Sequence, residues 1–516
     1  MKNKFLYTLI ILLFIGWGSG CSKSINENNL SYPELNPSKT DLNAGTWKTM
    51  LLTTPDEFAL AAPVASNTPG YIAELNEIKS WQEKLNDQQK EIIRYWSAGA
   101  ILRWNEILRE LVAKHNLPPY QNADGTYPAP NANNPFAYPI FPFANPPYAS
   151  RAYAYVSAAQ YDALVAAYHY KKLYNRSAPY KLDSTIKALV PKSDLPSYPS
   201  EDGAVVGVTV ELLKLLFPTD LAFIQEKANE HKLYRIMAGA NVRGEIEAGE
   251  SLGKLVAGKF TARARADRAG TAGGNATIWA QLEQQTAATG EIPWISYESP
   301  KRPPMLPLFG KVRTFLFDSA TLVSIRPPAP PSTNSPEFKK ELEEVLYYSK
   351  NPTRERMRIV HYWADGVNTA TPPGHWNAIA ADEFVQQQYS EVRWARNLAL
   401  LNMALMDAAI ACWDTKFLYF NPRPSQVDPN IKTLTGLPNF PSYTSGHSTF
   451  SGAAATVLGH MIPAKATRFT EMANEASLSR IYGAIHYRSD CVEGLKCGER
   501  VGGFAVTRAK SDGADQ

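Results

Sequence analysis

A repeat with one constant spacing is the feature of this sequence that most restricts its fold. Residues 162–179 and 407–424 resemble each other, and the correspondence continues without a gap to Arg243 and Arg488. The matched pairs, each 245 positions apart, include Asp162 with Asp407, Lys171 with Lys416, Tyr174 with Tyr419, Pro179 with Pro424, Ser200 with Ser445, and Arg235 with Arg480. Helical composition alone does not keep one spacing over so long a stretch. The repeat therefore predicts two structurally related units.

Both units carry a helical pattern. Apolar residues recur at helical spacing, and alternation with a period of two is rare, which predicts helices at 86–115, 150–174, 203–217, 222–259, 352–366, 383–416, 448–461 and 466–488. Prolines cluster between the units and predict irregular connections there. The expected fold is all-α, with two related helical bundles at residues 86–260 and 350–516, joined by a Pro-rich connection at 261–349.

The N-terminus has the pattern of an export signal. Lys2 and Lys4 precede an apolar run, 5–15, that is too short to cross a bilayer. Small residues then lead to Cys21, which resembles the lipidated cysteine of bacterial lipoproteins. We therefore expect a signal peptide at residues 1–20 and a membrane-anchored, exported protein with lipid on Cys21.

Gly18 departs from this lipoprotein pattern, because an apolar residue is usual at its position. An ordinary secretion signal that is cut elsewhere is the alternative. Residues 21–85 are expected to form a tether and a covering segment. No stretch after the signal is predicted to cross a membrane.

The two copies differ at four positions where chemistry is expected. The pairs, second copy first, are Arg423 and Ala178, Gly446 and Glu201, His447 and Asp202, and His486 and Asn241. Cationic or small groups in one copy are therefore replaced by neutral or acidic groups in the other. We predict that the first bundle is a degenerate copy that acts as scaffold, and that the second bundle holds the functional site.

Three spaced segments of the second copy form the candidate site. They are Lys416-x6-Arg423-Pro424, Ser445-Gly446-His447, and Ser479-Arg480-x5-His486-x3-Asp490. Lysine and arginine carry permanent positive charge, and guanidinium groups match tetrahedral oxyanions. The serine adds a hydroxyl donor, backbone amides at a helix start favour anions, and histidines act as ligands, nucleophiles or acid–base groups. The segments predict a site for phosphate, vanadate or a similar oxyanion.

These segments resemble the signature of the type 2 phosphatidic acid phosphatase and vanadium-dependent haloperoxidase superfamily, which is K-x6-RP, PSGH and SR-x5-H-x3-D. Thr444 departs from it, because the signature has proline there. The segments 440–443 and 486–490 are similar to the haloperoxidase branch. The resemblance covers about residues 350–505 and implies a haloperoxidase-like enzyme with vanadate as its cofactor.

The resemblance also implies a role for each residue. His486 would bind the vanadium of vanadate, and the vanadate oxygens would be bound by Lys416, Arg423, Ser445, Gly446 and Arg480. His447 would be the acid–base group. Lys416 would also polarise bound peroxide, and Asp490 would orient His486 or form a structural ion pair. The implied substrates are hydrogen peroxide, a halide and a small organic acceptor.

Two other functions remain open at this point. One is an exported acid phosphatase of the same superfamily, which acts through a phosphohistidine at His486 and needs no vanadate. The other is a non-catalytic surface lipoprotein, which the intact oxyanion-binding set disfavours. The net charge of +4, from 53 basic and 49 acidic residues, does not indicate nucleic-acid binding.

Four further residues have more than one interpretation. Cys491 and Cys497 lie close together in the sequence, and a small-loop disulfide is predicted for an exported protein, with two reduced thiols as the alternative. Phe440 either packs in the core or lines a halide pocket. His375 has aromatic neighbours, which favours packing.

Overall fold

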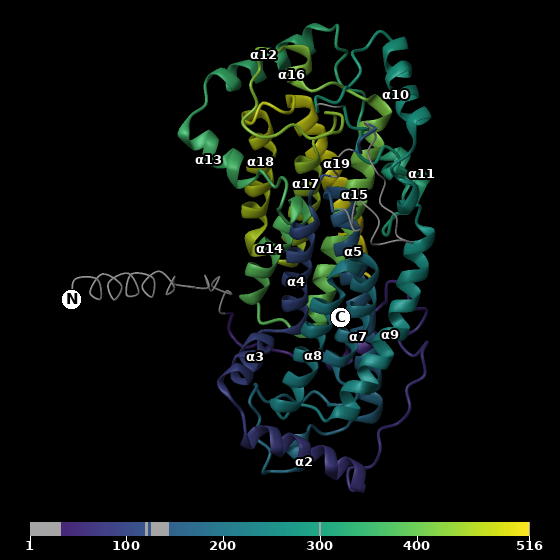
Figure 1. The fold of residues 1–516 in the computed structure, drawn as a ribbon, viewed down its shortest axis with the longest axis vertical. Helices are drawn as coiled ribbons and strands as arrows, with labels where there is room; N and C mark the ends of the chain where they lie inside the picture. The colour runs from purple at the N-terminus through teal and green to yellow at the C-terminus, as the bar shows by residue number, and fades with distance from the viewer. Residues whose placement is uncertain (1–31, 119–121, 125–143, 299–300, 515–516) are drawn as a thin grey trace, which may run out of the picture. The chain divides into compact units, whose positions relative to one another are not determined.

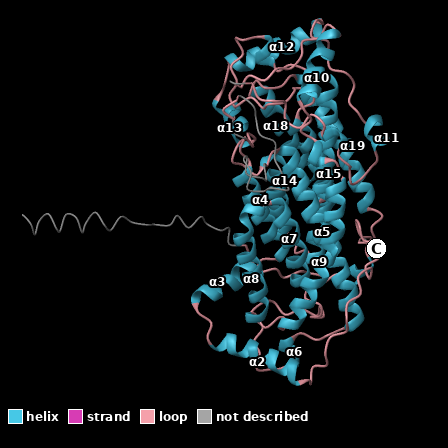
Figure 2. Cartoon of the chain, turned by 45° about the vertical axis from the view of Figure 1, so that its right-hand side comes forward, coloured by secondary structure: helices cyan, strands magenta, loops and turns pink. Residues whose placement is uncertain are grey.

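The computed structural model describes residues 32–118, 122–124, 144–298 and 301–514. The regular elements of these residues are all helices, which confirms the all-α prediction (Figure 2). Glu34–Gln516 forms one compact unit. The predicted signal peptide and its Cys21 lie outside the described residues.

The helices of the first half of Glu34–Gln516, with η for a 3-10 helix, are η1 (Leu42–Thr46), α2 (Pro69–Glu83), α3 (Asp87–Ser97), α4 (Ala100–His115), α5 (Pro146–Tyr174), α6 (Pro179–Leu182), α7 (Glu201–Leu216), η2 (Pro218–Asp220), α8 (Leu221–Met237) and α9 (Arg243–Ala266). The connection contains η3 (Ala269–Thr271), α10 (Ala276–Ala288), η4 (Phe309–Lys311), α11 (Ser319–Ser324) and α12 (Pro336–Lys350). The second half contains α13 (Arg354–Tyr362), α14 (Thr371–Val385), α15 (Glu391–Tyr419), α16 (Pro424–Val427), α17 (Gly446–Met461), η5 (Pro463–Lys465), α18 (Ala466–Tyr482) and α19 (Arg488–Ala509) (Figure 1).

The helix boundaries repeat with the same spacing as the sequence. The helices α5, α7, α8 and α9 begin 245 positions before α15, α17, α18 and α19, respectively. The N-caps of α7 and α17 are also equivalent, because Ser200 and Ser445 each accept a hydrogen bond from the backbone N–H three residues later. The two halves therefore share one order of elements, and their origin by duplication stays an interpretation.

The two halves pack against each other through their long central helices, α5 and α15. Within each half, α7 packs on α9 and α17 packs on α19 at very short range. A Cβ at Gly253 would lie 2.2 Å from the Ala204 carbonyl oxygen, and a Cβ at Gly498 would lie 2.1 Å from that of Thr449. Glycine is required at both positions for the helices to approach this closely.

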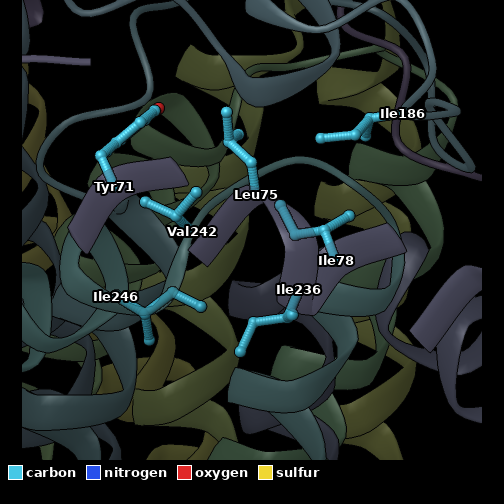
Figure 3. Close-up of a cluster of buried hydrophobic side chains, with 7 residues drawn as sticks. All are labelled: Tyr71, Leu75, Ile78, Ile186, Ile236, Val242 and Ile246. Carbon is cyan, nitrogen blue, oxygen red and sulfur yellow. The ribbon is translucent and has the colours of Figure 1, made fainter. Parts of the chain in front are cut away.

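A covering helix, α2, buries an apolar face against the first bundle. Thr68 caps its start, and Tyr71, Leu75 and Ile78 point inward. They pack with the buried side chains shown in Figure 3, namely Ile186, Ile236, Val242 and Ile246. Hydrophobic burial thus holds this part of the predicted tether and covering segment on the bundle.

Several predicted helices are divided in the structure. The segment predicted at 86–115 breaks at Gly99, and the one at 222–259 breaks near Gly239, because both glycines adopt positive φ angles of 121° and 72°. The helix α19 was not predicted, since its many glycines weaken the apolar pattern that indicates a helix. The Pro-rich connection also forms helices, of which α12 packs Phe338 and Val345 into a small core.

One prediction about membrane-spanning length needs correction. Glu391–Val427 is long and apolar enough, by composition, to cross a membrane. The most apolar window of this segment, 18 residues long, is entirely buried inside the protein, so its apolar character is that of a core helix.

The predicted disulfide between Cys491 and Cys497 is wrong. Both residues lie within α19, and both are buried, free cysteines, as is Cys412. Residues six positions apart in a helix are separated by about 9 Å along its axis and point to different sides. A sequence spacing that suits a small loop therefore does not suit this helix.

Candidate functional site

The candidate residues come together where several helices of the second half begin or end. Their positions are the last turn of α15 for Lys416, the N-cap of α16 for Arg423, the N-cap of α17 for Ser445, the last turn of α18 for Arg480, the link between α18 and α19 for His486, and the first turn of α19 for Asp490. None of these six residues is more than 2% exposed. Residues up to 74 positions apart in the sequence thus share one buried site.

His486 is held between a carboxylate and a guanidinium group. Its Nδ1 lies 2.8 Å from Asp490 Oδ2, and its Nε2 lies 2.9 Å from Arg423 Nη1. Because the guanidinium group only donates hydrogen bonds, Nε2 must accept and Nδ1 must carry the proton. Burial, followed by the positive charges of Arg423 and Lys416, holds the pKa of His486 well below its usual value. The imidazole is therefore neutral, with the lone pair of Nε2 facing the cations.

Lys416 is a buried cation whose hydrogen-bond partners are all neutral. Its Nζ donates to the carbonyl oxygens of Pro441 and Ser442, each at 2.8 Å. Burial, with the nearby positive charge of Arg423 acting in the same direction, lowers the pKa of Lys416 to about 7. An anion in contact with Lys416 Nζ would therefore stabilise the charged form of this side chain.

Arg423 and Arg480 are also buried cations that donate hydrogen bonds to neutral groups. Arg423 donates to the carbonyl oxygens of Phe440 and Ile485, and Arg480 donates to the Ser479 hydroxyl at 2.8 Å. Burial lowers the pKa of each arginine to about 10. Within the described residues, neither arginine lies within ion-pair distance of a carboxylate.

In the first bundle, the equivalent lysine and arginine are paired with carboxylates of the protein itself. Lys171 Nζ lies 2.6 Å from Glu201 Oε2, and Arg235 lies 3.2 Å from both Glu201 and Asp202. These two carboxylates occupy the positions that are glycine and histidine in the second copy. The second copy keeps the equivalent lysine and arginine, adds Arg423 and lacks these two carboxylates, so its site is suited to take negative charge from a ligand.

Gly446 leaves room for such a ligand. A Cβ at this position would meet only ring atoms of Phe450 and Trp413, both at 3.9 Å, although Gly446 begins a helix whose neighbours are buried. The helix start itself favours negative charge. Ser445 caps the helix by accepting from Ser448 N at 3.3 Å, and its hydroxyl proton remains available to donate.

His447 lies at the edge of the site with its side chain 16% exposed. Burial, followed by the positive charge of Arg480, holds its pKa well below the usual value, so the imidazole is neutral. Its Nε2 has no hydrogen-bond partner within the described part of the chain. Asp365 Oδ2 lies 3.7 Å away, beyond hydrogen-bond range. This nitrogen is therefore free to exchange a proton with a ligand.

The structure adds residues that the sequence analysis did not name. Asp365 faces His447 and also lies 3.0 Å from His375 Nδ1, so His375 belongs to this polar group as well as stacking on Trp363 at 4.6 Å. One signal for Asp365 was present in the sequence, because the first copy has Ala98 in the similar segment Tyr-Trp-x-x-Gly. Ser442 lies in the segment 440–443 that resembles the haloperoxidase branch, but that resemblance assigned it no role.

Phe440 packs in the core, as one of its two interpretations expected, and its proposed place in a halide pocket stays a prediction. Its ring packs on Trp413 with the centroids 4.9 Å apart, which is core packing. The same ring lies 5.0 Å from Lys416 Nζ and 5.2 Å from Arg423 Cζ. Phe440 therefore forms an apolar wall directly beside two of the cations.

The donor set fits an oxyanion such as vanadate. Three buried cations lack carboxylate partners, a glycine opens space at a helix start, and a histidine lone pair faces the cations. Within the described residues, no group of three or more His, Cys, Asp or Glu side chains is placed to hold a bare metal ion. Vanadium bound as its oxyanion is compatible with this chemistry.

Comparisons with known proteins agree with this geometry. Residues 397–511 match the family model of the PAP2 superfamily, which confirms the family resemblance of the three motifs. Vanadium chloroperoxidase from Curvularia inaequalis is 32% identical over 123 residues, or 18% of this chain. The match spans only about a fifth of that relative, at 20% of its length.

Two crystal structures share the fold. A bacterial vanadium-dependent iodoperoxidase has a TM-score of 0.58 and 23% identity, over 79% of this chain and 96% of the other. The apo form of a bacterial vanadium-dependent chloroperoxidase has a TM-score of 0.50 and 15% identity, over 72% of this chain and 96% of the other. At these identities the similarity establishes the fold alone.

Proposed function

We propose, from the PAP2 superfamily match of residues 397–511 and from the buried cations beside it, that the chain is a vanadate-dependent haloperoxidase. It would oxidise a halide with hydrogen peroxide to a hypohalous species, which then reacts with a small organic acceptor. The observation that carries this proposal is the group of three buried cations, for which no carboxylate among the described residues lies within ion-pair distance. The names of the related chloroperoxidase and iodoperoxidase support it.

The residues divide the work between binding and proton transfer. When bound, vanadate supplies a Lewis-acidic vanadium(V) centre that activates hydrogen peroxide without a separate redox partner. Lys416, Arg423 and Arg480 would neutralise the oxyanion, and His486 would offer its Nε2 lone pair to vanadium. His447, neutral and unbonded at Nε2, would take a proton from peroxide.

A phosphatase is the second candidate, and the state of His486 favours it specifically. Asp490 accepts from Nδ1, which leaves Nε2 as the nucleophilic nitrogen of a neutral imidazole. The same cations would then bind the phosphate oxygens, and His447 would protonate the leaving group. This reaction needs no vanadate.

One experiment separates the two activities. The purified protein is assayed with and without orthovanadate for peroxide-dependent halide oxidation and for hydrolysis of a phosphate ester. A haloperoxidase gains the first activity with vanadate, whereas a phosphatase loses the second, because vanadate competes for its anion site. Tight vanadate binding without halide oxidation would reject the haloperoxidase.

We also propose that the protein is exported and anchored by lipid on Cys21. The support is the basic, apolar and small-residue order of residues 1–20. Mass spectrometry of the mature N-terminus tests this proposal independently of the catalytic one.

A further inference from the structure

Ser442 is a fully buried residue that touches both sides of the anion site. It lies in the loop between α16 and α17 and is 0% exposed. Its backbone oxygen accepts from Lys416 Nζ at 2.8 Å, and its hydroxyl donates to Asp490 Oδ2. One residue thus connects the end of α15 with the start of α19.

The carboxylate of Asp490 is held by one of its two oxygens. Oδ2 accepts from the Ser442 hydroxyl, from His486 Nδ1 at 2.8 Å and from Tyr487 N at 3.1 Å. Oδ1 is buried and has no hydrogen-bond partner among the described residues. The three donors on Oδ2 therefore determine how the carboxylate is rotated, and the Ser442 hydroxyl is the donor that comes from a different segment.

The orientation of Asp490 is passed on to His486. The Nδ1 hydrogen bond sets both the tautomer and the plane of the imidazole ring, and so the direction of the Nε2 lone pair. A carboxylate free to turn toward its unbonded oxygen would hold the ring less well. The Ser442 hydroxyl also lies 3.4 Å from His486 Nδ1 itself. The direction of Nε2 therefore depends on this hydroxyl.

We propose that Ser442 is a positioning residue, which fixes the Asp490 carboxylate and thereby aims His486 Nε2 at the bound oxyanion. This inference rests on the proposed anion-binding function of the site. It holds for vanadate and for phosphate, because both are tetrahedral oxyanions that would meet the same nitrogen.

The first bundle contains an equivalent hydroxyl, which does not help to position a histidine. Ser197, the equivalent of Ser442, donates to Glu245 Oε1 at 2.7 Å. The other oxygen of Glu245 accepts from Asn241 Nδ2 at 3.0 Å and from Val242 N at 3.2 Å. Both oxygens of Glu245 therefore have donors, and the position equivalent to His486 is Asn241 rather than a histidine. The Ser197 hydroxyl thus stabilises only the local fold.

The test compares Ser442→Ala with Ser197→Ala. Isothermal titration calorimetry of the protein without vanadate measures its affinity for orthovanadate and for inorganic phosphate. Nitrogen-15 NMR of the histidine rings reports the tautomer of His486. Ser442→Ala is expected to lower both affinities about 10–100-fold, the usual range for a partner of a ligating histidine, and to give mixed tautomers. Ser197→Ala should leave affinity and tautomer unchanged.

Ser442→Cys is a second variant in case Ser442→Ala does not fold. Its thiol fills the same space and is a weaker hydrogen-bond donor, so its loss of oxyanion affinity should lie between wild type and Ser442→Ala. Unchanged affinity and tautomer in the Ser442 variants, or an equal loss in Ser197→Ala, would overturn the inference. The assay does not use halide oxidation, so a wild type without peroxidase activity would refute the proposed function and leave this inference standing.

Discussion

Replacing Gly446 with glutamate should close the anion site and, at the same time, stabilise the protein without its ligand. The change copies the first bundle, where Glu201 begins α7 and pairs with Lys171 at 2.6 Å and Arg235 at 3.2 Å. Gly446 has room for a Cβ, which would meet nothing nearer than 3.9 Å, and the equivalent residue of the first bundle accommodates the whole glutamate side chain. A carboxylate in the first turn of a helix is also favourable. Gly446→Glu should therefore supply internally the charge that a ligand otherwise brings.

The magnitude follows from the burial of Lys416. Its pKa falls from the usual 10.5 to about 7, which at about 1.4 kcal/mol per pKa unit corresponds to roughly 5 kcal/mol of unfavourable charge burial. A new carboxylate recovers only part of this, since its own desolvation opposes the gain. We expect the free energy of unfolding to rise by about 1.5–3 kcal/mol, the contribution of a hydrogen bond to a charged group.

Urea denaturation in the absence of phosphate and vanadate measures this change, and calorimetry measures vanadate binding. The wild type should gain about 2.7 kcal/mol of stability at vanadate concentrations 100 times its dissociation constant. Gly446→Glu should gain nothing from vanadate. Gly446→Gln is the matched control, because it has the same size without the charge and should not be stabilised.

A Gly446→Glu protein that is less stable than Gly446→Gln and still binds vanadate would refute the reasoning. That result would mean that the cations do not face the start of α17. The counter-charge argument would then fail for the whole site.

The remaining predictions concern single residues. His486→Ala should bind vanadate more weakly and lose nearly all activity even at high vanadate, whereas His447→Ala should keep most of its vanadate affinity, lose about 10²–10⁴-fold in turnover and lose one limb of its pH–rate profile. Vanadate titrations with peroxidase assays check both, and the reverse pattern would exchange the two roles. Because the pKa of Lys416 is lowered to about 7, the unfolded chain binds more protons than the folded one between pH 7 and pH 10, so stability should rise with pH in this window by up to about 1.4 kcal/mol per pH unit. Lys416→Met should remove this contribution when urea denaturation at pH 7 and pH 9 is compared with the wild type. An unchanged slope would show that burial does not lower the pKa of Lys416. Cys21→Ser should release the protein from membranes or leave the signal uncleaved, and an unmodified mature N-terminus elsewhere would reject the anchor.

The residues of the anion site could be predicted from the sequence because their chemistry is local to each motif. Lys416, Arg423, Arg480 and the two histidines keep fixed spacings, and the first copy shows what the same segments contain when the counter-charge is internal. Asp365 and Ser442 could not be ranked in this way. Their importance lies in contacts with His447 and Asp490, which only the folded chain brings within reach.

Most helices could also be predicted from the sequence, because apolar periodicity and repeat spacing can be read directly along the chain. The constant spacing of 245 positions predicted paired elements, and the structure has helices beginning at that spacing. Glycine-rich α19 escaped prediction, because its helix is stabilised by close contact with α17 through Gly498 and not by its own apolar pattern.

Tertiary structure alone decided the electrostatic state of the site and the state of its cysteines. From the sequence alone, lysine and arginine are expected to have their usual pKa values. The pKa values of Lys416 and Arg423 are lowered because packing removes water from around both side chains. Cys491 and Cys497 are close in sequence, yet the helix that contains them keeps their side chains apart. The sequence by itself determined which charged groups the site contains. The packing of the helices around them determined that these groups are buried and that the cations have no carboxylate within ion-pair distance among the described residues.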